Sequence, residues 1–256
     1  MAFGPGRPVA RLGERDGAGG APFDERPPMT DTLTIGFVLF DDLTQLDFTG
    51  PLQVLSRLPG ARVHLVGKTL DPVRTDCSPF ILPDTTLADC PDLDLICIPG
   101  GFGVDAAMED RAIVDFVTRQ AGQARYVTSV CTGAFILGAA GVLEGRKATT
   151  HWRYHDHLAA FGAEPVKARV VRDGNLFTGG GVTAGIDFAF TIAVEIAGET
   201  VAQAIQLGLE YDPHPPVDSG SPDKAPDRVR GAVEQRFGPR MAAFAEVVER
   251  VRGVGV

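Results

Sequence analysis

The chain lacks an excess of basic residues. Its 256 residues include 24 Lys and Arg against 33 Asp and Glu, which gives a formal net charge of -9. Because nucleic-acid affinity comes mainly from basic contacts to phosphates, we expect no nucleic-acid partner. The sequence also lacks an 18-residue apolar run and an N-terminal signal pattern. We therefore expect no association with membranes and a cytoplasmic location.

Cysteine is scarce as well. The four cysteines show neither a CxxC pair nor a Cys/His spacing typical of zinc ligands, and they are Cys77, Cys90, Cys97 and Cys131. This pattern predicts free thiols in a reducing compartment and no metal site. His151, His155 and His157 are close together in the sequence, but no carboxylate or cysteine stands at a suitable spacing to complete a metal site with them.

The composition predicts one large domain preceded by a leader. Residues 1–31 are dense in Gly, Pro and charge and have no apolar period, so we expect them to be disordered. Apolar residues make up 44% of the chain and charged residues 22%, which is ordinary for a globular domain. We expect residues 32–256 to form that single domain, including a C-terminal amphipathic helix.

Strand-like and helix-like segments alternate along this domain. The apolar runs at 33–40, 94–98 and 125–130 are continuous, as in buried parallel strands. We expect a further strand at 61–67, a hairpin at 168–178 and a Pro-rich loop at 213–226. Helices are expected at about 50–58, 110–123, 132–141, 182–197 and 226–250. The pattern predicts an α/β fold: a doubly wound, mostly parallel sheet sandwiched by helices, as in flavodoxin.

Cys131 is the strongest candidate for a catalytic residue. It stands between the buried strand 125–130 and the helix expected from Thr132, which is the layout of a nucleophile elbow. We expect the helix N-terminus to favour the thiolate over the thiol. The alternative is that Cys131 is a small buried hydrophobic residue. Cys97 lies within a strand, and we expect it to be structural.

Two other loops at strand ends carry polar groups that could serve the same site. Asp47 follows the first strand, where it is either a helix cap or a proton donor that shares a proton with the Cys131 sulfur. Gly100 and Gly101 follow the strand at 94–98. Their backbone N–H groups, and the N–H of Thr132, could hold an intermediate, although a plain glycine turn is the alternative.

His151 invites interpretation as the base of a Cys/His dyad, because an imidazole can activate a thiol. A structural or surface role is the alternative, since three of the five histidines lie together at 151–157.

Several motifs, taken in order, resemble those of a known family. They are QLDFTGPLQVLSRLPGA at 45–61, IPGGFG at 98–103, SVCTGAFILGAAGVL at 129–143, ATTHW at 148–152, FTGGGVTAGIDFA at 177–189 and LGLEYDPHPP at 207–216. From about Thr32 to Pro222 the chain is similar to the PfpI-like branch of the class I glutamine-amidotransferase-like superfamily. Within that branch it resembles the hydratases that act on isonitriles.

The resemblance implies roles for three residues: Cys131 as nucleophile, Asp47 as the assisting carboxylate and Thr132 as the residue after the nucleophile. It also implies a homodimer without a cofactor. Peptidase-like relatives carry a His after the nucleophile where this chain has Thr132, which disfavours peptidase activity. Regulators of transcription with ATTHW carry an appended helix-turn-helix module, and the roughly forty residues that follow the similar region are too few for one.

The reaction that the resemblance implies is hydration of a small-molecule isonitrile to an N-substituted formamide by a cysteine-dependent hydro-lyase. We expect an apolar pocket for the substituent, lined in part by Phe102 and Val182 beside Gly100, Gly101 and His151. Two alternatives stay open. One is a glyoxalase-like or amide-cleaving activity, and the other is a thiol redox sensor without enzymatic activity.

Overall fold

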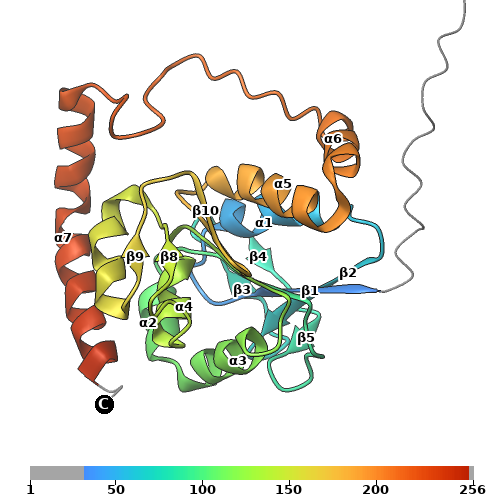
Figure 1. Cartoon of the computed structure of the whole chain (residues 1–256). Helices are drawn as coiled ribbons and strands as arrows, with labels where there is room; N and C mark the ends of the chain where they lie inside the picture. Colours follow the sequence, from blue (N-terminus) through green and yellow to red (C-terminus); the bar gives the residue numbers. More distant parts are fainter. Residues whose placement is uncertain (1–31, 254–256) are drawn as a thin grey trace, which may run out of the picture.

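A computed structural model describes residues 32–253 (Figure 1). The leader expected at 1–31 lies outside the described residues. Within residues 32–253, no helix combines the length and the apolar composition that a membrane crossing requires.

A seven-stranded sheet forms the centre of the domain. Its strand order is β10-β11-β7-β6-β1-β2-β5, and only the pairing of β10 with β11 is antiparallel. The strands are β1 (Leu33–Val38), β2 (Ala61–Gly67), β5 (Thr85–Thr86), β6 (Leu95–Ile98), β7 (Tyr126–Val130), β10 (Val170–Asp173) and β11 (Leu176–Gly179). The predicted doubly wound, mostly parallel sheet is confirmed. The chain leaves β1 towards β2 and later returns to β6 on the other side, so the strand order reverses between β1 and β6.

Helices cover both faces of this sheet. Figure 1 shows α1 (Gln45–Leu55), α5 (Ala184–Ala197) and α6 (Glu199–Gly208) above it, and α2 (Val104–Glu109), α3 (Arg111–Ala121) and α4 (Ala134–Ala139) below. The remaining elements are small: the pair β3 (Val73–Arg74) and β4 (Phe80–Ile81), the pair β8 (Lys147–Ala148) and β9 (Glu164–Pro165), and two 3₁₀ segments, η1 (Cys131–Gly133) and η2 (Trp152–Phe161).

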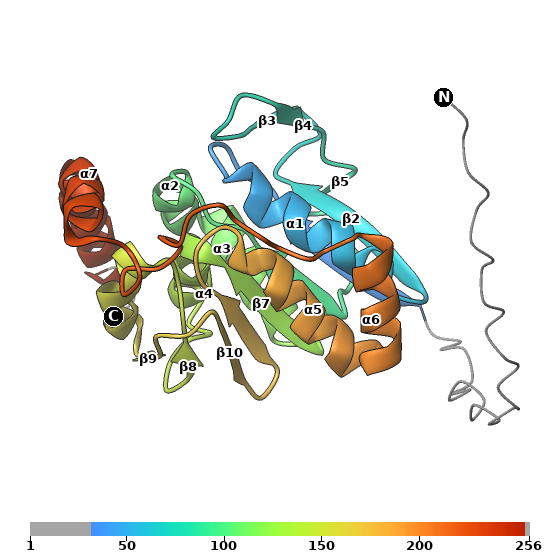
Figure 2. The same ribbon diagram turned by 90° about the horizontal axis from the view of Figure 1, so that it is seen from above.

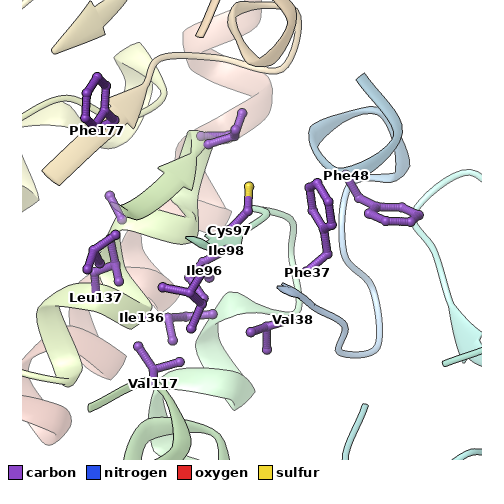
Figure 3. Close-up of a cluster of buried hydrophobic side chains, with 14 of the residues drawn as sticks. Phe37, Val38, Phe48, Ile96, Cys97, Ile98, Val117, Ile136, Leu137 and Phe177 are labelled. Atoms are coloured by element: carbon purple, nitrogen blue, oxygen red, sulfur yellow. The ribbon is translucent and has the colours of Figure 1, made fainter. Parts of the chain in front are cut away.

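The core lies against the middle strands (Figure 3). All four residues of β6 are buried, and Phe37 of β1 packs edge-on against Phe48 of α1 with 5.4 Å between ring centroids. Cys97 is fully buried in this core, as expected of a structural cysteine. Burial of such side chains stabilises the fold by roughly 1.5–3 kcal/mol each.

The first helix begins earlier than the sequence predicted. We expected it to start near Gly50, but α1 starts at Gln45 and contains Pro51. The tertiary contact with α5 explains the difference. A Cβ on Gly185 of α5 would lie 3.3 Å from the Pro51 ring, so the two helices pack closely at this point and the helix tolerates its proline there.

The last helix, α7 (Asp227–Gly253), stands at the edge of the domain, next to α2 and η2 (Figures 1 and 2). Its buried side chains are Phe244, Val247 and Val248, all in the C-terminal half. A long exposed segment, 211–226, connects it to α6, where the sequence predicted a Pro-rich loop. The helix α6 was not anticipated, because its residues follow the apolar helix 182–197 without a turn signal other than Gly198.

Candidate active site

Three loops meet at the carboxyl ends of β1, β6 and β7. The Thr44 N–H donates to the Gly100 carbonyl over 2.8 Å, which joins the loop after β1 to the loop after β6. The Gly101 N–H donates to the Thr132 hydroxyl over 3.0 Å, which joins the loop after β6 to the residues after β7. The strand order therefore brings Asp47, Gly100 and Cys131 together, although they are far apart in the chain.

Cys131 occupies a strained backbone conformation at the end of β7. Its φ is +56°, a left-handed value that costs a non-glycine residue roughly 1–2 kcal/mol. Two hydrogen bonds hold it there: its N–H donates to the Gly180 carbonyl over 2.9 Å, and its carbonyl accepts from the Thr150 hydroxyl over 2.7 Å. Gly133 is required just beyond, because a Cβ on it would lie 2.2 Å from the Ile98 carbonyl oxygen.

Asp47 is fully buried in the first turn of α1. Its Oδ2 accepts a hydrogen bond from the Gly100 N–H over 2.9 Å. Its Oδ1 has no hydrogen-bond partner among the described residues, and the Cys131 thiol is near enough to the carboxyl to lower its pKa. Burial raises the pKa of Asp47 to about 7, against the opposing effects of the Gly100 N–H and the thiol.

The environment of Cys131 also raises the pKa of its thiol, first through burial and then through the charge of Asp47. The Thr132 N–H acts in the opposite direction but is the weaker influence. We expected a lowered pKa from the helix N-terminus, and this expectation is wrong in direction. The physical reason is that only 5% of Cys131 is exposed, so the thiolate loses its hydration.

Asp47 and Cys131 therefore form a coupled pair that loses its first proton near pH 7 and keeps the second well above that pH, because two adjacent buried anions would repel each other. With a pKa near 7, Asp47 is suited to accept the proton of the thiol and to return it. In the resting pair the negative charge lies mainly on Asp47, because the pKa of the Cys131 thiol is raised well above its ordinary value.

The glycine N–H groups have partners within the protein. Gly100 donates to Asp47, and Gly101 donates to the Thr132 hydroxyl, which in turn lies 3.3 Å from the Gly101 carbonyl oxygen. We expected these N–H groups to hold an intermediate, but they donate instead to the side chains of Asp47 and Thr132. The Thr132 N–H, which acts on the Cys131 sulfur, is the donor that stays near the reacting atom.

Replacement of Gly100 by Ala should disable the pair while leaving the protein folded. A Cβ at this position would lie 2.6 Å from the Thr132 nitrogen and 2.8 Å from Oδ2 of Asp47, so backbone and carboxyl must move apart. We expect the alkylation rate of Cys131 by iodoacetamide at pH 7 to fall about tenfold, with a stability loss of about 1–3 kcal/mol in urea unfolding. Gly122→Ala is the matched control, because its Cβ would meet only ordinary contacts at 3.5 Å.

His151 lies near this site but makes no hydrogen bond to the thiol among the described residues. Its Nδ1 accepts from the Arg153 N–H over 3.3 Å, and its ring stacks on Phe237 of α7 with 6.1 Å between centroids. Burial lowers the pKa of His151 to about 4, so the imidazole is neutral at physiological pH. This geometry does not support the Cys/His dyad.

Phe102 and Val182, which we expected to line an apolar pocket, differ in their exposure to solvent. Phe102 is 55% exposed and lies under the guanidinium of Arg240, 5.4 Å from its ring centroid, so it is a surface residue. Val182 is half-buried just before α5, and a Cβ on its neighbour Gly181 would lie 3.0 Å from the His151 ring. Val182 and His151 are thus on one side of the site. Within residues 32–253, no three His, Cys, Asp or Glu side chains converge as a metal site requires.

Sequence reasoning missed three residues that support the site. Thr150 and Gly180 fix the backbone of Cys131. Burial raises the pKa of the Tyr154 phenol, and the nearby charge of Cys131 contributes less in the same direction. The motifs ATTHW and FTGGG contain Thr150 and Gly180, but nothing in either motif shows that their polar groups point to the elbow.

Comparisons with known proteins give concordant results. A family model described as the DJ-1/PfpI family matches residues 34–195. An isonitrile hydratase from Pseudomonas putida is 58% identical over 218 residues, which cover 85% of this chain and 96% of that protein. A transcriptional regulator, GbdR, from Pseudomonas aeruginosa is 30% identical over 76% of this chain but only 54% of its own length. The crystal structure of a ThiJ/PfpI family protein from Pseudomonas syringae superposes with a TM-score of 0.85, is 41% identical, and matches 91% of this chain and 96% of that chain.

Proposed function

Because this chain belongs to the DJ-1/PfpI family, we propose that it is a hydro-lyase that converts isonitriles, R–N≡C, to N-substituted formamides. The Pseudomonas putida isonitrile hydratase, which is 58% identical to this chain, matches over nearly its whole length. The observation that carries the proposal is the buried Asp47 carboxyl beside Cys131, since this pair supplies a nucleophile and a proton together.

The first half of the reaction needs a nucleophile and an acid at the same carbon. Asp47 accepts the proton of the Cys131 thiol, and the resulting thiolate attacks the terminal carbon of the isonitrile. As the C–S bond forms, electron density accumulates on that carbon, and the carboxyl of Asp47 returns the proton to it. The product is a thioimidate, R–N=CH–S, bound to Cys131, and Asp47 is again a carboxylate.

The second half adds water. The Asp47 carboxylate accepts a proton from a water molecule that attacks the thioimidate carbon, and it passes that proton to the nitrogen. It then accepts the proton of the new hydroxyl group as the C–S bond breaks. The formamide R–NH–CHO leaves, and the protonated Asp47 returns its proton to the Cys131 thiolate, which restores the starting thiol and carboxylate. The net reaction adds one water molecule to R–N≡C and gives R–NH–CHO.

Incubation with an alkyl isonitrile tests this proposal directly. We expect the formyl proton of the N-alkyl formamide to appear in the proton NMR spectrum at a rate that scales with enzyme concentration. Absence of formamide, together with turnover of an α-oxoaldehyde, would instead identify a glyoxalase-like enzyme. A protein that turned over neither substrate and only oxidised at Cys131 would be a thiol sensor.

We further propose that residues 32–256 act as a single domain, as a homodimer in the cytoplasm. The isonitrile hydratase that resembles this chain matches over 96% of its own length, so the proposed activity requires no additional domain. All four cysteines lie within residues 32–253 and are free thiols, as expected of a protein in a reducing compartment. Size-exclusion chromatography with light scattering measures the oligomeric state.

A further inference from the structure

Arg240 of α7 makes an ion pair, hydrogen bonds and cation–π contacts with residues that are distant in the chain. Its Nη1 and Nη2 form a bidentate pair with the Asp105 carboxylate at the start of α2. Its Nε donates to the Tyr154 hydroxyl over 3.3 Å, and its Nη2 also donates to the Phe102 carbonyl over 3.2 Å. The guanidinium lies over the rings of Phe102 and Phe244, at 5.4 and 5.8 Å from their centroids.

This environment differs from that of an ordinary surface ion pair. The side chains of Arg240 and Asp105 are only 22% and 19% exposed. By contrast, Arg250 on the same helix pairs with Glu109 of α2 at 2.7 Å, and those side chains are 55% and 41% exposed. The planar guanidinium also satisfies several acceptors at fixed angles, which a lysine ammonium cannot do.

The Phe102 carbonyl connects Arg240 to the active-site candidates. Phe102 follows Gly100 and Gly101 directly, and these glycines hold Asp47 and Thr132 by hydrogen bonds of 2.9 and 3.0 Å. Tyr154, the other neutral acceptor of Arg240, is four residues after Thr150, whose hydroxyl donates to the Cys131 carbonyl over 2.7 Å. A displacement of the segment 100–102 would therefore lengthen the bond from Gly100 to the carboxyl.

We propose that Arg240 is a positioning residue: through the Phe102 carbonyl it holds the segment 100–102 where the Gly100 N–H meets Asp47 and the Gly101 N–H meets Thr132. Its relevance to turnover rests on the proposed function. The ionisation of the Asp47 and Cys131 pair can be measured without the isonitrile reaction, which keeps the two proposals separable.

The sign of the expected pH effect follows from the groups around Asp47. These groups are the Cys131 thiol, the Gly100 N–H, the carboxylate of Asp76 and the Cys97 thiol. Among them the Gly100 N–H is the strongest influence that favours the ionised carboxyl. Loss of this hydrogen bond raises the pH at which the pair loses its first proton, because the other groups stay in place.

The experiment measures the rate of Cys131 alkylation by iodoacetamide between pH 5.5 and 9 in the full chain, with peptide mass spectrometry to separate Cys131 from the exposed Cys77. The rate follows the singly ionised pair. In Arg240→Met and Arg240→Lys we expect the midpoint to rise by about 0.5 to 1 pH unit, which slows alkylation at pH 7 about two to five times. Arg250→Met is the matched control and should keep the wild-type midpoint.

Urea unfolding shows which variants are folded. If Arg240→Met does not fold, the alkylation midpoint of Arg240→Lys alone tests the proposal. An unchanged or lower midpoint in the folded variants would overturn the proposal. It would also be overturned if Arg240→Lys kept the wild-type profile, because the ion pair with Asp105 would then suffice. An equal shift in Arg250→Met would assign the effect to the docking of α7 as a whole. Failure of formamide formation in the wild-type protein would reject the proposed function but leave this result intact.

Discussion

Replacement of Cys131 by Ala should abolish formamide formation, with a loss of at least about 10⁴-fold in rate, as is usual when a covalent nucleophile is removed. Without the sulfur no thioimidate forms, and a water molecule alone is a poor nucleophile towards the isonitrile carbon. The measurement is the formyl proton signal by NMR, at equal protein concentrations.

Two features make Cys131→Ala a clean test. Alanine keeps the Cβ, so the cost of the +56° φ angle is unchanged, and removal of one buried sulfur should destabilise the fold by only about 1–2 kcal/mol. Cys77→Ala is the matched control, because Cys77 is an exposed free cysteine. A Cys131→Ala protein that still formed formamide at more than about a hundredth of the wild-type rate would contradict covalent catalysis by this residue.

Replacement of Asp47 by Asn should lower formamide formation by about 10²- to 10⁴-fold, the range usual for loss of a general acid–base. The amide is nearly isosteric and its oxygen can accept from the Gly100 N–H, but it cannot transfer a proton to the isonitrile carbon. Alkylation of Cys131 should continue, because the charge of Asp47 raises the pKa of the thiol and the Asn side chain removes that effect. Loss of both reactions would indicate disruption of the site.

The same variant should be more stable than the wild type at pH 8. The pKa of Asp47 rises from 3.8 in the unfolded chain to about 7 in the folded protein, so the folded state binds the proton more tightly. The stabilisation from this group is complete below about pH 4 and is lost as the pH rises to 7. The difference in unfolding free energy between Asp47→Asn and wild type should therefore grow over this window, by an amount on the order of several kcal/mol.

Urea unfolding at pH 5, 6 and 8 measures this difference. Asp115→Asn is the control, because Asp115 is an exposed carboxylate on α3 whose side chain is 64% accessible, and its unfolding free energy should follow that of the wild type. A difference in unfolding free energy between Asp47→Asn and wild type that stayed constant from pH 5 to pH 8 would show that Asp47 is ionised at little cost. The expected pair of results, lost catalysis with gained stability, is typical of a buried catalytic carboxyl group.

The sequence by itself was sufficient for the parallel strands and for bringing the two candidate residues, Cys131 and Asp47, to one edge of the sheet. Continuous apolar runs are a property of neighbouring residues, so strands β1, β6 and β7 could be predicted within a few residues, and the strand–Cys–Thr–Gly order marked Cys131. Asp47 and Gly100 could be assigned to the same edge because parallel strands end together there. The start of α1 was misplaced because the packing of Gly185 on Pro51 joins segments more than a hundred residues apart.

Only the tertiary structure decided the pKa values of Asp47 and Cys131 and the hydrogen-bond partners of the residues around them. A pKa depends on how much water a group loses and on which charges surround it, and both are set by residues remote in the chain. The helix N-terminus therefore suggested a lowered pKa for Cys131, whereas burial raises it. In the same way, the N–H groups of Gly100 and Gly101 donate to Asp47 and Thr132, and Arg240 of α7 donates to the Phe102 carbonyl, 138 residues away in the chain. Local patterns encode elements and reactive residue types, but burial and hydrogen-bond partners arise only when the chain folds.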